Sequence, residues 1–358
     1  MSSPPPYSFV ERLLHTLAFS TPSVQLGAAD VERAMHGRRF EHLPVTRPIF
    51  ITSLPRAGTT LLLERLAAHP DLAAHCYRDM PFVLSPLLWE QLSGPFRVEH
   101  ARAERAHGDG VQVNVDSPEA FEEVAWMAFW PGKYGPGDIR LWAEDDQADE
   151  FPAFMTSLLQ RVIAVRSTPE RPRSRYVSKN NANVARRRLL SRLFPDAAIV
   201  VPFREPVAQA MSLLTQHRRF LDLHREHDFT RRYMRDIGHF EFGALHRPIA
   251  FDGVADMRSR YSTDTLDYWL AYWIHGFRHV LSEGDGVVFV SYERLCSGGA
   301  AALDSLTTSL GLTSRALDGD QSFWEPRGHR DRRPEVHDQE LLAAADAVHA
   351  ELLSHSII

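Results

Sequence analysis

One stretch of the sequence combines residue types that bind anions. A short apolar run at 49–51 is typical of a buried parallel strand, and leucines at helical spacing follow at 61–66. The segment between them is a predicted strand-to-helix turn, in which a glycine lets backbone amides approach a ligand closely. The helix dipole, two hydroxyls and a guanidinium add to the attraction. The turn therefore predicts a site for a phosphate or sulfate group, formed by Arg56, Ala57, Gly58, Thr59 and Thr60.

This turn does not match the phosphate loop of nucleoside triphosphatases. That loop needs a glycine, four further residues and then Gly-Lys-Ser/Thr, and here both the first glycine and the lysine are missing. A nucleoside triphosphatase is therefore disfavoured.

Two later predicted strands bring further cations to the same region. The run 175–179 ends on Lys179, and the run 197–203 is followed by Arg204. Ligands of parallel sheets bind at the carboxyl ends of the strands. Ser212 lies about two turns into the helix that starts at position 206, so Arg204 and Ser212 could hold a second anion from two directions.

Acidic residues offer two sets of candidates for a proton acceptor. Asp79 lies 23 positions after Arg56 and directly after Arg78, so it is either one half of a salt bridge or an acid-base residue. A predicted helix with Ser117 as its N-cap carries further acids in its first turns, where they either complement the helix dipole or supply a second candidate base. These acids are Asp116, Glu119, Glu122 and Glu123.

Composition limits the partners. The net charge of −6 and the scattered basic residues argue against a nucleic-acid surface. The two cysteines lack metal-ligand spacing, and the histidines between 217 and 227 suit an exposed helix face equally well, so we predict no metal site. No apolar run approaches the roughly 20 residues of a membrane span, and the N-terminus lacks the apolar core of a signal peptide. We expect a soluble, cytoplasmic protein that has neither a nucleic-acid nor a membrane partner.

The motifs resemble those of the sulfotransferases that use 3′-phosphoadenosine 5′-phosphosulfate (PAPS). The turn at 54–60 resembles the 5′-phosphosulfate loop of that family, and the pair Arg204 and Ser212 resembles its 3′-phosphate motif, with the same spacing of eight residues. The resemblance implies that PAPS is the sulfuryl donor and that 3′,5′-adenosine bisphosphate (PAP) is the product. It also places Tyr292 near the adenine and, in a poorly matched loop, Arg327 and Gly328 near a phosphate.

The same resemblance suggests catalytic roles. Glycan and tyrosyl-protein sulfotransferases carry a glutamate near the position of Asp79, although the residue here is an aspartate. In cytosolic sulfotransferases the catalytic histidine follows the phosphosulfate loop at a distance that corresponds here to a position near Asp116. No histidine occurs there, so the resemblance does not extend to a histidine mechanism. The implied catalytic residues are Asp79 as general base, Lys179 beside the leaving phosphate, and Arg56 on the phosphosulfate.

We expect a single α/β domain over residues 1–358, with a three-layer, P-loop-like fold around a short central parallel sheet. Residues 1–45 are a predicted helical preface, and 94–170 and 217–282 are predicted helical inserts on the acceptor side. The predicted function is transfer of a sulfuryl group to a hydroxyl or amine of a small molecule, with aromatic content favouring an apolar or aromatic acceptor. Two alternatives stay open, a P-loop-like small-molecule kinase and a non-catalytic nucleotide-binding protein. The sequence leaves the oligomeric state open.

Overall fold

The computed structural model describes residues 8–94, 103–104, 112–284, 286–313 and 335–358. Of the residues predicted to bind the cofactor, Arg327 and Gly328 lie outside this part of the chain.

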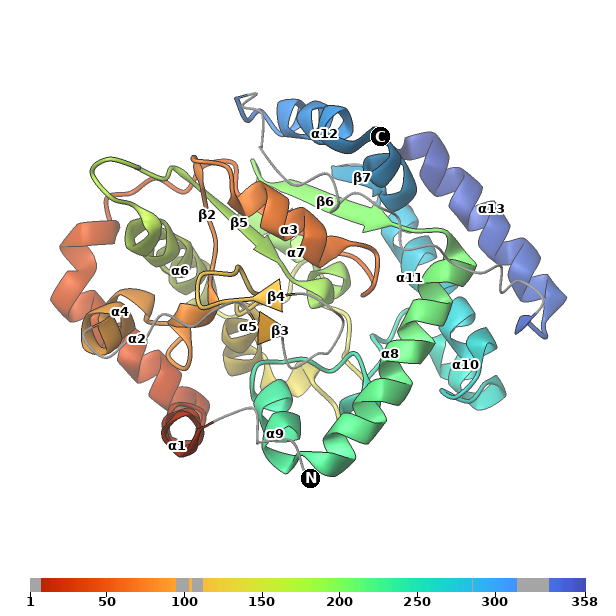
Figure 1. Cartoon of the computed structure of the whole chain (residues 1–358), viewed down its shortest axis with the longest axis horizontal. Helices are drawn as coiled ribbons and strands as arrows, with labels where there is room; N and C mark the ends of the chain where they lie inside the picture. The colour runs from red at the N-terminus through yellow and green to blue at the C-terminus, as the bar shows by residue number, and fades with distance from the viewer. Residues whose placement is uncertain (1–7, 95–102, 105–111, 285, 314–334) are drawn as a thin grey trace.

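A five-stranded parallel sheet forms the centre of the molecule (Figure 1). Its spatial order is β2-β5-β1-β6-β7. In the register, Ile51 at the end of β1 lies opposite Lys179 of β5 and Val200 of β6. The strands are β1 (Ile49–Ile51), β2 (Leu72–Ala73), β5 (Arg175–Lys179), β6 (Ala198–Phe203) and β7 (Val287–Ser291).

Helices cover both faces of this sheet because the strands bury both faces. Ile49 and Ile51 of β1 pack in one core with α3 (Thr59–Ala67) and α12 (Tyr292–Ser309). Phe50, between them, packs in the other core with α6 (Phe151–Arg166), α8 (Pro206–Glu226) and α11 (Leu266–Ser282). Successive strand side chains point to opposite faces, so this alternation produces three layers. The predicted three-layer α/β fold is confirmed.

The remaining elements surround this core. The preface predicted at 1–45 contains two helices, α1 (Phe9–Ala18) and α2 (Pro22–Phe40). A short hairpin, β3 (Ala103–Glu104) with β4 (Gln112–Val113), lies in the first predicted insert. The other helices are α4 (Pro86–Ser93), α5 (Glu123–Phe129), α7 (Arg187–Leu193), α9 (Asp228–Asp236), α10 (Val254–Arg260) and α13 (Gln339–His355), and the 3-10 turns are η1 (Tyr77–Asp79), η3 (Pro131–Lys133), η4 (Asn181–Ala185) and η5 (Gly243–Leu245).

The helix predicted to have Ser117 as its N-cap starts instead at Glu123, with Glu122 as its N-cap. Backbone groups of the preceding residues bond to the segment 75–78: the Tyr77 amide donates to the Ser117 carbonyl at 3.2 Å, and the Glu119 amide donates to the His75 carbonyl at 2.9 Å. The Ser117 carbonyl, which would accept the first intrahelical hydrogen bond, is used by Tyr77 instead, so the predicted start was wrong by five residues, about one and a half turns.

Candidate active site

Four parallel strands end at one edge of the sheet, and each leads to residues predicted to form the site. Strand β1 leads into residues 52–58, which we call the anion loop, and β5 ends at Lys179. Strand β6 is followed by Arg204 and β7 by Tyr292. The carboxyl ends of parallel strands share one edge, so the topology gathers residues that are far apart in the sequence.

The anion loop turns at two residues with positive φ, Arg56 at 69° and Gly58 at 86°. Helix α3 then starts at Thr59, and its N-cap, Gly58, makes no side-chain capping bond. The first N–H groups of a helix lack intrahelical partners, and the positive end of the helix dipole lies with them. The loop therefore has the backbone donors and the field that an anion requires.

The residues predicted to hold the two ends of the cofactor form one cluster. Arg56 Nε donates a hydrogen bond to Ser212 Oγ at 3.1 Å, which joins the anion loop to α8. The Arg204 guanidinium lies 4.8 Å from the centre of the Tyr292 ring. That ring packs against Gly58, where an added Cβ would lie 2.5 Å from Tyr292 Cδ2. Both predicted anion sites are therefore parts of a single surface.

Two cavities lie beside this cluster. The first, which we call the loop cleft, is lined by the anion loop and the start of α3, including Arg56, Thr59 and Thr60. The second, which we call the apolar pocket, is lined by residues of the anion loop, α8, α11 and the segment 238–249. The lining residues that both cavities share are Pro55, Lys179, Asn181, His239 and Glu241.

Lys179 supplies the cation on the shared wall of the two cavities. Its side chain comes from the carboxyl end of β5, and the residue is only 7% exposed. In the part of the chain that the structure describes, no carboxylate lies within ion-pair distance of its ammonium group. A buried cation without an anion is unfavourable, so this position is suited to receive negative charge from a ligand.

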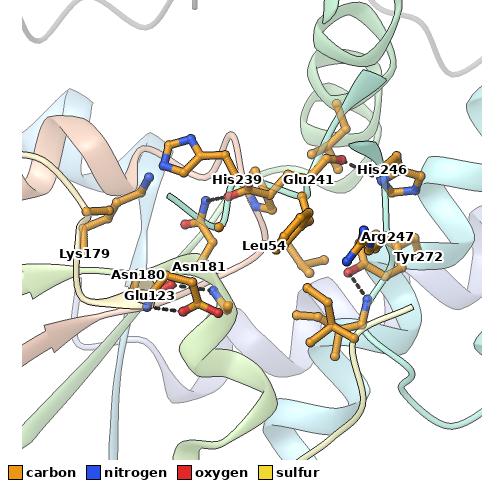
Figure 2. Close-up of a pocket in the computed structure, with 18 of the residues that line it drawn as sticks. Leu54, Glu123, Lys179, Asn180, Asn181, His239, Glu241, His246, Arg247 and Tyr272 are labelled. Carbon is orange, nitrogen blue, oxygen red and sulfur yellow. Dashed lines mark hydrogen bonds between the residues drawn. The ribbon is translucent and has the colours of Figure 1, made fainter. Parts of the chain in front are cut away.

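The apolar pocket has mostly hydrocarbon and aromatic walls (Figure 2). Besides Lys179, its charged lining residues are Glu123, Glu241 and Arg247. Apolar walls with a few polar groups are typical of small-molecule sites. The larger apolar and aromatic lining residues are Leu54, Ile139, Leu213, Phe240, Ile249, Trp269 and Tyr272.

A family model described as the sulfotransferase family matches residues 48–315, which is most of the chain and includes the anion loop, Lys179, Arg204 and Tyr292. The chain belongs to the sulfotransferase family. The resemblance inferred from the sequence motifs is thereby confirmed.

Solved structures with a similar fold are also sulfotransferases. STF1 from Mycobacterium tuberculosis is 13% identical, with a TM-score of 0.50 over 95% of this chain and 87% of its own. STF9 from Mycobacterium avium is 14% identical, with a TM-score of 0.51 over 99% of this chain and 88% of its own. At such low identity these structures support the fold alone. No curated protein shows significant similarity to the chain.

In this sulfotransferase, Asp79 is held in a buried network. The residue is 1% exposed, forms an ion pair with Arg166, and accepts the Cys76 amide at 2.9 Å, while His75 Nδ1 lies 3.0 Å from its Oδ2. Burial alone would raise the pKa of Asp79, but Arg166, His75 and the Cys76 amide lower it to about 2. Asp79 is absent from the described lining of both cavities.

These contacts correspond to the salt-bridge interpretation of Asp79, with Arg166 as the partner. Arg78, its neighbour in the sequence, pairs instead with Asp116. A catalytic role for Asp79 stays a prediction.

The other candidate acids of the sulfotransferase have different surroundings. Asp116 is exposed, and Glu119 accepts hydrogen bonds from Tyr77 Oη and from the Ala120 amide. Glu122 is fully buried and accepts a hydrogen bond from Ser178 Oγ at 2.7 Å. Glu123 alone of this set lines the apolar pocket, and it is ion-paired with Arg186.

Several polar lining residues of the sulfotransferase site were not predicted, among them Asn181, His239, Glu241 and Arg247. Asn181 comes two residues after the tip of β5, so its position at a strand end could have identified it. The other three lie in an irregular segment between α9 and α10, which has no periodicity that predicts a site.

No group of three metal-binding side chains occurs among the residues that the structure describes. In the same part of the sulfotransferase, no helix is both long and apolar enough to cross a bilayer.

Proposed function

We propose that this sulfotransferase moves a sulfuryl group from PAPS to a hydroxyl or amine of a small molecule and releases PAP. Arg56, Thr59, Thr60 and the amides of the anion loop would hold the 5′-phosphosulfate. Arg204 and Ser212 would hold the 3′-phosphate, and the Tyr292 ring, stacked with Arg204, would form part of the same nucleotide surface.

The observation that carries the proposal is the placement of Lys179. Its ammonium group is buried on the wall between the loop cleft and the apolar pocket and has no carboxylate partner among the described residues. Sulfuryl transfer leaves a negative charge on the 5′-phosphate of the donor. A cation fixed at that point stabilises the charge as it develops, at no cost of reorganisation.

Catalysis would consist mainly of positioning and charge stabilisation, by analogy with phosphoryl transfer through a loose transition state. The loop cleft would hold the donor, and the apolar pocket would hold the acceptor on the other side of the shared wall. The lining of the pocket supports an apolar or aromatic acceptor.

Calorimetry tests the donor assignment. We expect PAP to bind in the presence of EDTA, and Lys179→Ala and Arg56→Ala to weaken PAP binding, each by about 10-fold or more, because charge-assisted hydrogen bonds contribute about 1.5–3 kcal/mol. Arg204→Ala should weaken PAP more than adenosine 5′-phosphosulfate, which lacks the 3′-phosphate. Tighter binding of ATP with Mg²⁺ than of PAP would favour a kinase instead.

Turnover separates an enzyme from a nucleotide-binding scaffold. Radiolabelled PAPS incubated with a panel of phenols, alcohols and amines should yield a sulfated product. PAP binding without any product across the panel would contradict the catalytic part of the proposal.

A further inference from the structure

Glu241 lies on the wall that the two cavities share, in the irregular segment that joins α9 to η5. Hydrogen bonds fix this segment. The Arg247 amide donates to the Phe240 carbonyl at 2.8 Å, and His246 Nδ1 lies 2.7 Å from the carbonyl oxygen of Glu241. The other ring nitrogen of His246 lies 2.8 Å from Tyr268 Oη on α11. The backbone at Glu241 is therefore tied to the packed helical layer.

A chain of hydrogen bonds joins Glu241 to the anion loop. Asn181 Nδ2 donates to Glu241 Oε1 at 3.2 Å, as Figure 2 shows. Thr59 Oγ1, at the start of α3, donates to Asn181 Oδ1 at 3.4 Å. The carboxylate of Glu241 is thus positioned relative to the residues that would hold the group to be transferred.

Of the two carboxylates that line the apolar pocket, Glu241 makes the fewer hydrogen bonds and ion pairs. The lone pairs of Glu123, the other carboxylate of the apolar pocket, are used by Arg186, Tyr134 and Asn180. The only described side chain that bonds the carboxylate of Glu241 is Asn181. No lysine, arginine or histidine of the described residues lies within ion-pair distance of this carboxylate. It therefore keeps lone pairs that can accept a proton.

We propose that Glu241 is the general base of this sulfotransferase and that Asn181 positions it. This assignment rests on the proposed function. The acceptor oxygen or nitrogen forms a bond to sulfur while the sulfur–oxygen bond to the 5′-phosphate breaks. The proton of the acceptor passes to a carboxylate oxygen of Glu241, and the electron pair of the broken bond stays on the phosphate beside Lys179. Solvent then takes the proton from Glu241.

The test compares Glu241→Gln with wild type in sulfuryl transfer from PAPS to two phenols. A general base typically contributes about 10²–10⁴-fold, so we expect kcat with 4-methylphenol to fall by that factor. With 4-nitrophenol, which is largely ionised at weakly alkaline pH, the loss should be less than about 10-fold, because no base is needed. If wild type turns over neither phenol, the rate of PAPS hydrolysis by water is measured instead. Because water must lose a proton as 4-methylphenol does, Glu241→Gln should lower this hydrolysis rate by about 10²–10⁴-fold.

The controls separate this proposal from the proposed function and from a structural role. PAP affinity of Glu241→Gln should stay within a few-fold of wild type; failure of wild type itself to bind PAP would refute the proposed function instead. The same substitution at Glu123 should lower the melting temperature, since it leaves the Arg186 guanidinium buried without its partner, whereas Glu241→Gln should not. Equal losses with both phenols, or full activity, would overturn the assignment to Glu241. If His239→Gln loses kcat with 4-methylphenol while Glu241→Gln does not, His239 is the general base instead.

A separate observation concerns the acceptor. Arg247 lines the apolar pocket, and its guanidinium lies 4.4 Å from the centre of the Phe240 ring. Burial lowers the pKa of Arg247, and the charge of Arg235 lowers it further. No carboxylate of the described residues lies within ion-pair distance of the Arg247 guanidinium. An arginine in an apolar site without an acidic partner is suited to bind an anionic group of a ligand.

We infer that the acceptor is an apolar or aromatic molecule that carries a carboxylate, with Arg247 as the residue that selects it. This inference also rests on the proposed function. The test uses 4-methylphenol and the series 4-hydroxybenzoate, 4-hydroxyphenylacetate and 3-(4-hydroxyphenyl)propanoate, because the spacer sets whether the carboxylate reaches Arg247. At least one acid should have a kcat/KM about 10- to 100-fold above that of 4-methylphenol.

Arg247→Leu should abolish that preference. Arg235→Leu is the matched control: Arg235 lines a neighbouring groove that Arg247 also borders, but it does not line the apolar pocket and is paired with Asp236, so the preference should persist. If wild type prefers the neutral phenol over every acid of the series, or if Arg247→Leu keeps the preference, the inference is wrong.

Discussion

At the scale of single residues, the partners of buried charges separate those that hold the fold from those that face a ligand. Asp79 and Arg166 neutralise each other away from both cavities, whereas Lys179 has no described anion and lines both of them. Breaking a buried ion pair costs stability, while removing an unpaired cation should cost ligand affinity. This difference gives Asp79 a clear test.

Asp79→Asn should lower the free energy of unfolding by about 3–5 kcal/mol, because it leaves the Arg166 guanidinium without its anion. Urea denaturation at pH 7 measures this loss. Adding Arg166→Met should recover part of it, because the double variant no longer contains an unpaired buried charge. Turnover at saturating PAPS decides the remaining question. A loss of about 10²–10⁴-fold in turnover, with stability unchanged, would make Asp79 the base after all.

The pH dependence follows from the same contacts. Because the folded state lowers the pKa of Asp79 from 3.8 to about 2, the folded state binds its proton less readily than the unfolded state does. Its contribution to stability is therefore present above about pH 4 and is lost as the pH falls toward 2. The stability of Asp79→Asn, measured by denaturation at a series of pH values, should therefore fall less than that of wild type between about pH 4 and 2.

The sequence allowed prediction of some site residues for a physical reason. Lys179 and Arg204 follow apolar runs, and strand ends converge at one edge of a parallel sheet, so their proximity could be expected. Glu241 could not be found in this way. Its segment has neither helical nor strand periodicity, and hydrogen bonds to distant residues such as Asn181 fix its place.

At the scale of elements, the anion loop depends on a close approach between two connections. The Tyr292 ring at the start of α12 occupies the space in which a side chain at Gly58 would lie. Gly58 itself has φ of 86°, a conformation that costs other residues roughly 1–2 kcal/mol. The motif Gly-Thr-Thr identified the turn from the sequence, but the packing of Tyr292 on it depends on the β7 register, which local patterns do not specify.

Gly58→Ala should therefore lower both stability and PAP affinity. We expect a loss of roughly 1–2 kcal/mol from the backbone and a further loss from displacement of the Tyr292 ring. Calorimetry with PAP and thermal denaturation measure the two effects. The matched control is Gly27→Ala, in helix α2, where a Cβ meets nothing within 4 Å, so the same substitution should stabilise by about 0.5–1 kcal/mol. In the double variant Gly58→Ala/Tyr292→Ala, the alanine Cβ no longer meets the Tyr292 ring. Only the part of the stability loss that comes from this steric clash should therefore be recovered.

At the scale of the whole molecule, the N-terminal helices are joined to the layer of α6 by buried charge. Glu32 of α2 and Arg161 of α6 form an ion pair at 3.1 Å, and the two residues are 0% and 2% exposed. Arg161 Nη2 also donates to the Ala29 carbonyl at 3.1 Å, and the amide of Leu88 in α4 donates to Glu32 Oε2 at 2.6 Å. Helical spacing predicted these helices, but it could not indicate that their polar residues are buried against distant elements.

This pair bears on the prediction of a single domain over residues 1–358. If α1 and α2 belong to the same cooperative unit as the sheet, wild type should unfold in one calorimetric transition, with the calorimetric enthalpy equal to the van't Hoff enthalpy. Burial raises the pKa of Glu32 to about 7 even beside Arg161, so in Arg161→Met the buried Glu32 must either stay charged without its partner or take up a proton. Arg161→Met alone should therefore cost up to about 3–5 kcal/mol at pH 7, whereas Glu32→Leu combined with Arg161→Met should be close to wild type in stability. A separate low-temperature transition in wild type would show that residues 1–45 unfold on their own and would contradict the single-domain prediction. Because Glu32 and Arg161 are absent from the described lining of both cavities, PAP affinity of the double variant serves as the check that its site has kept its shape.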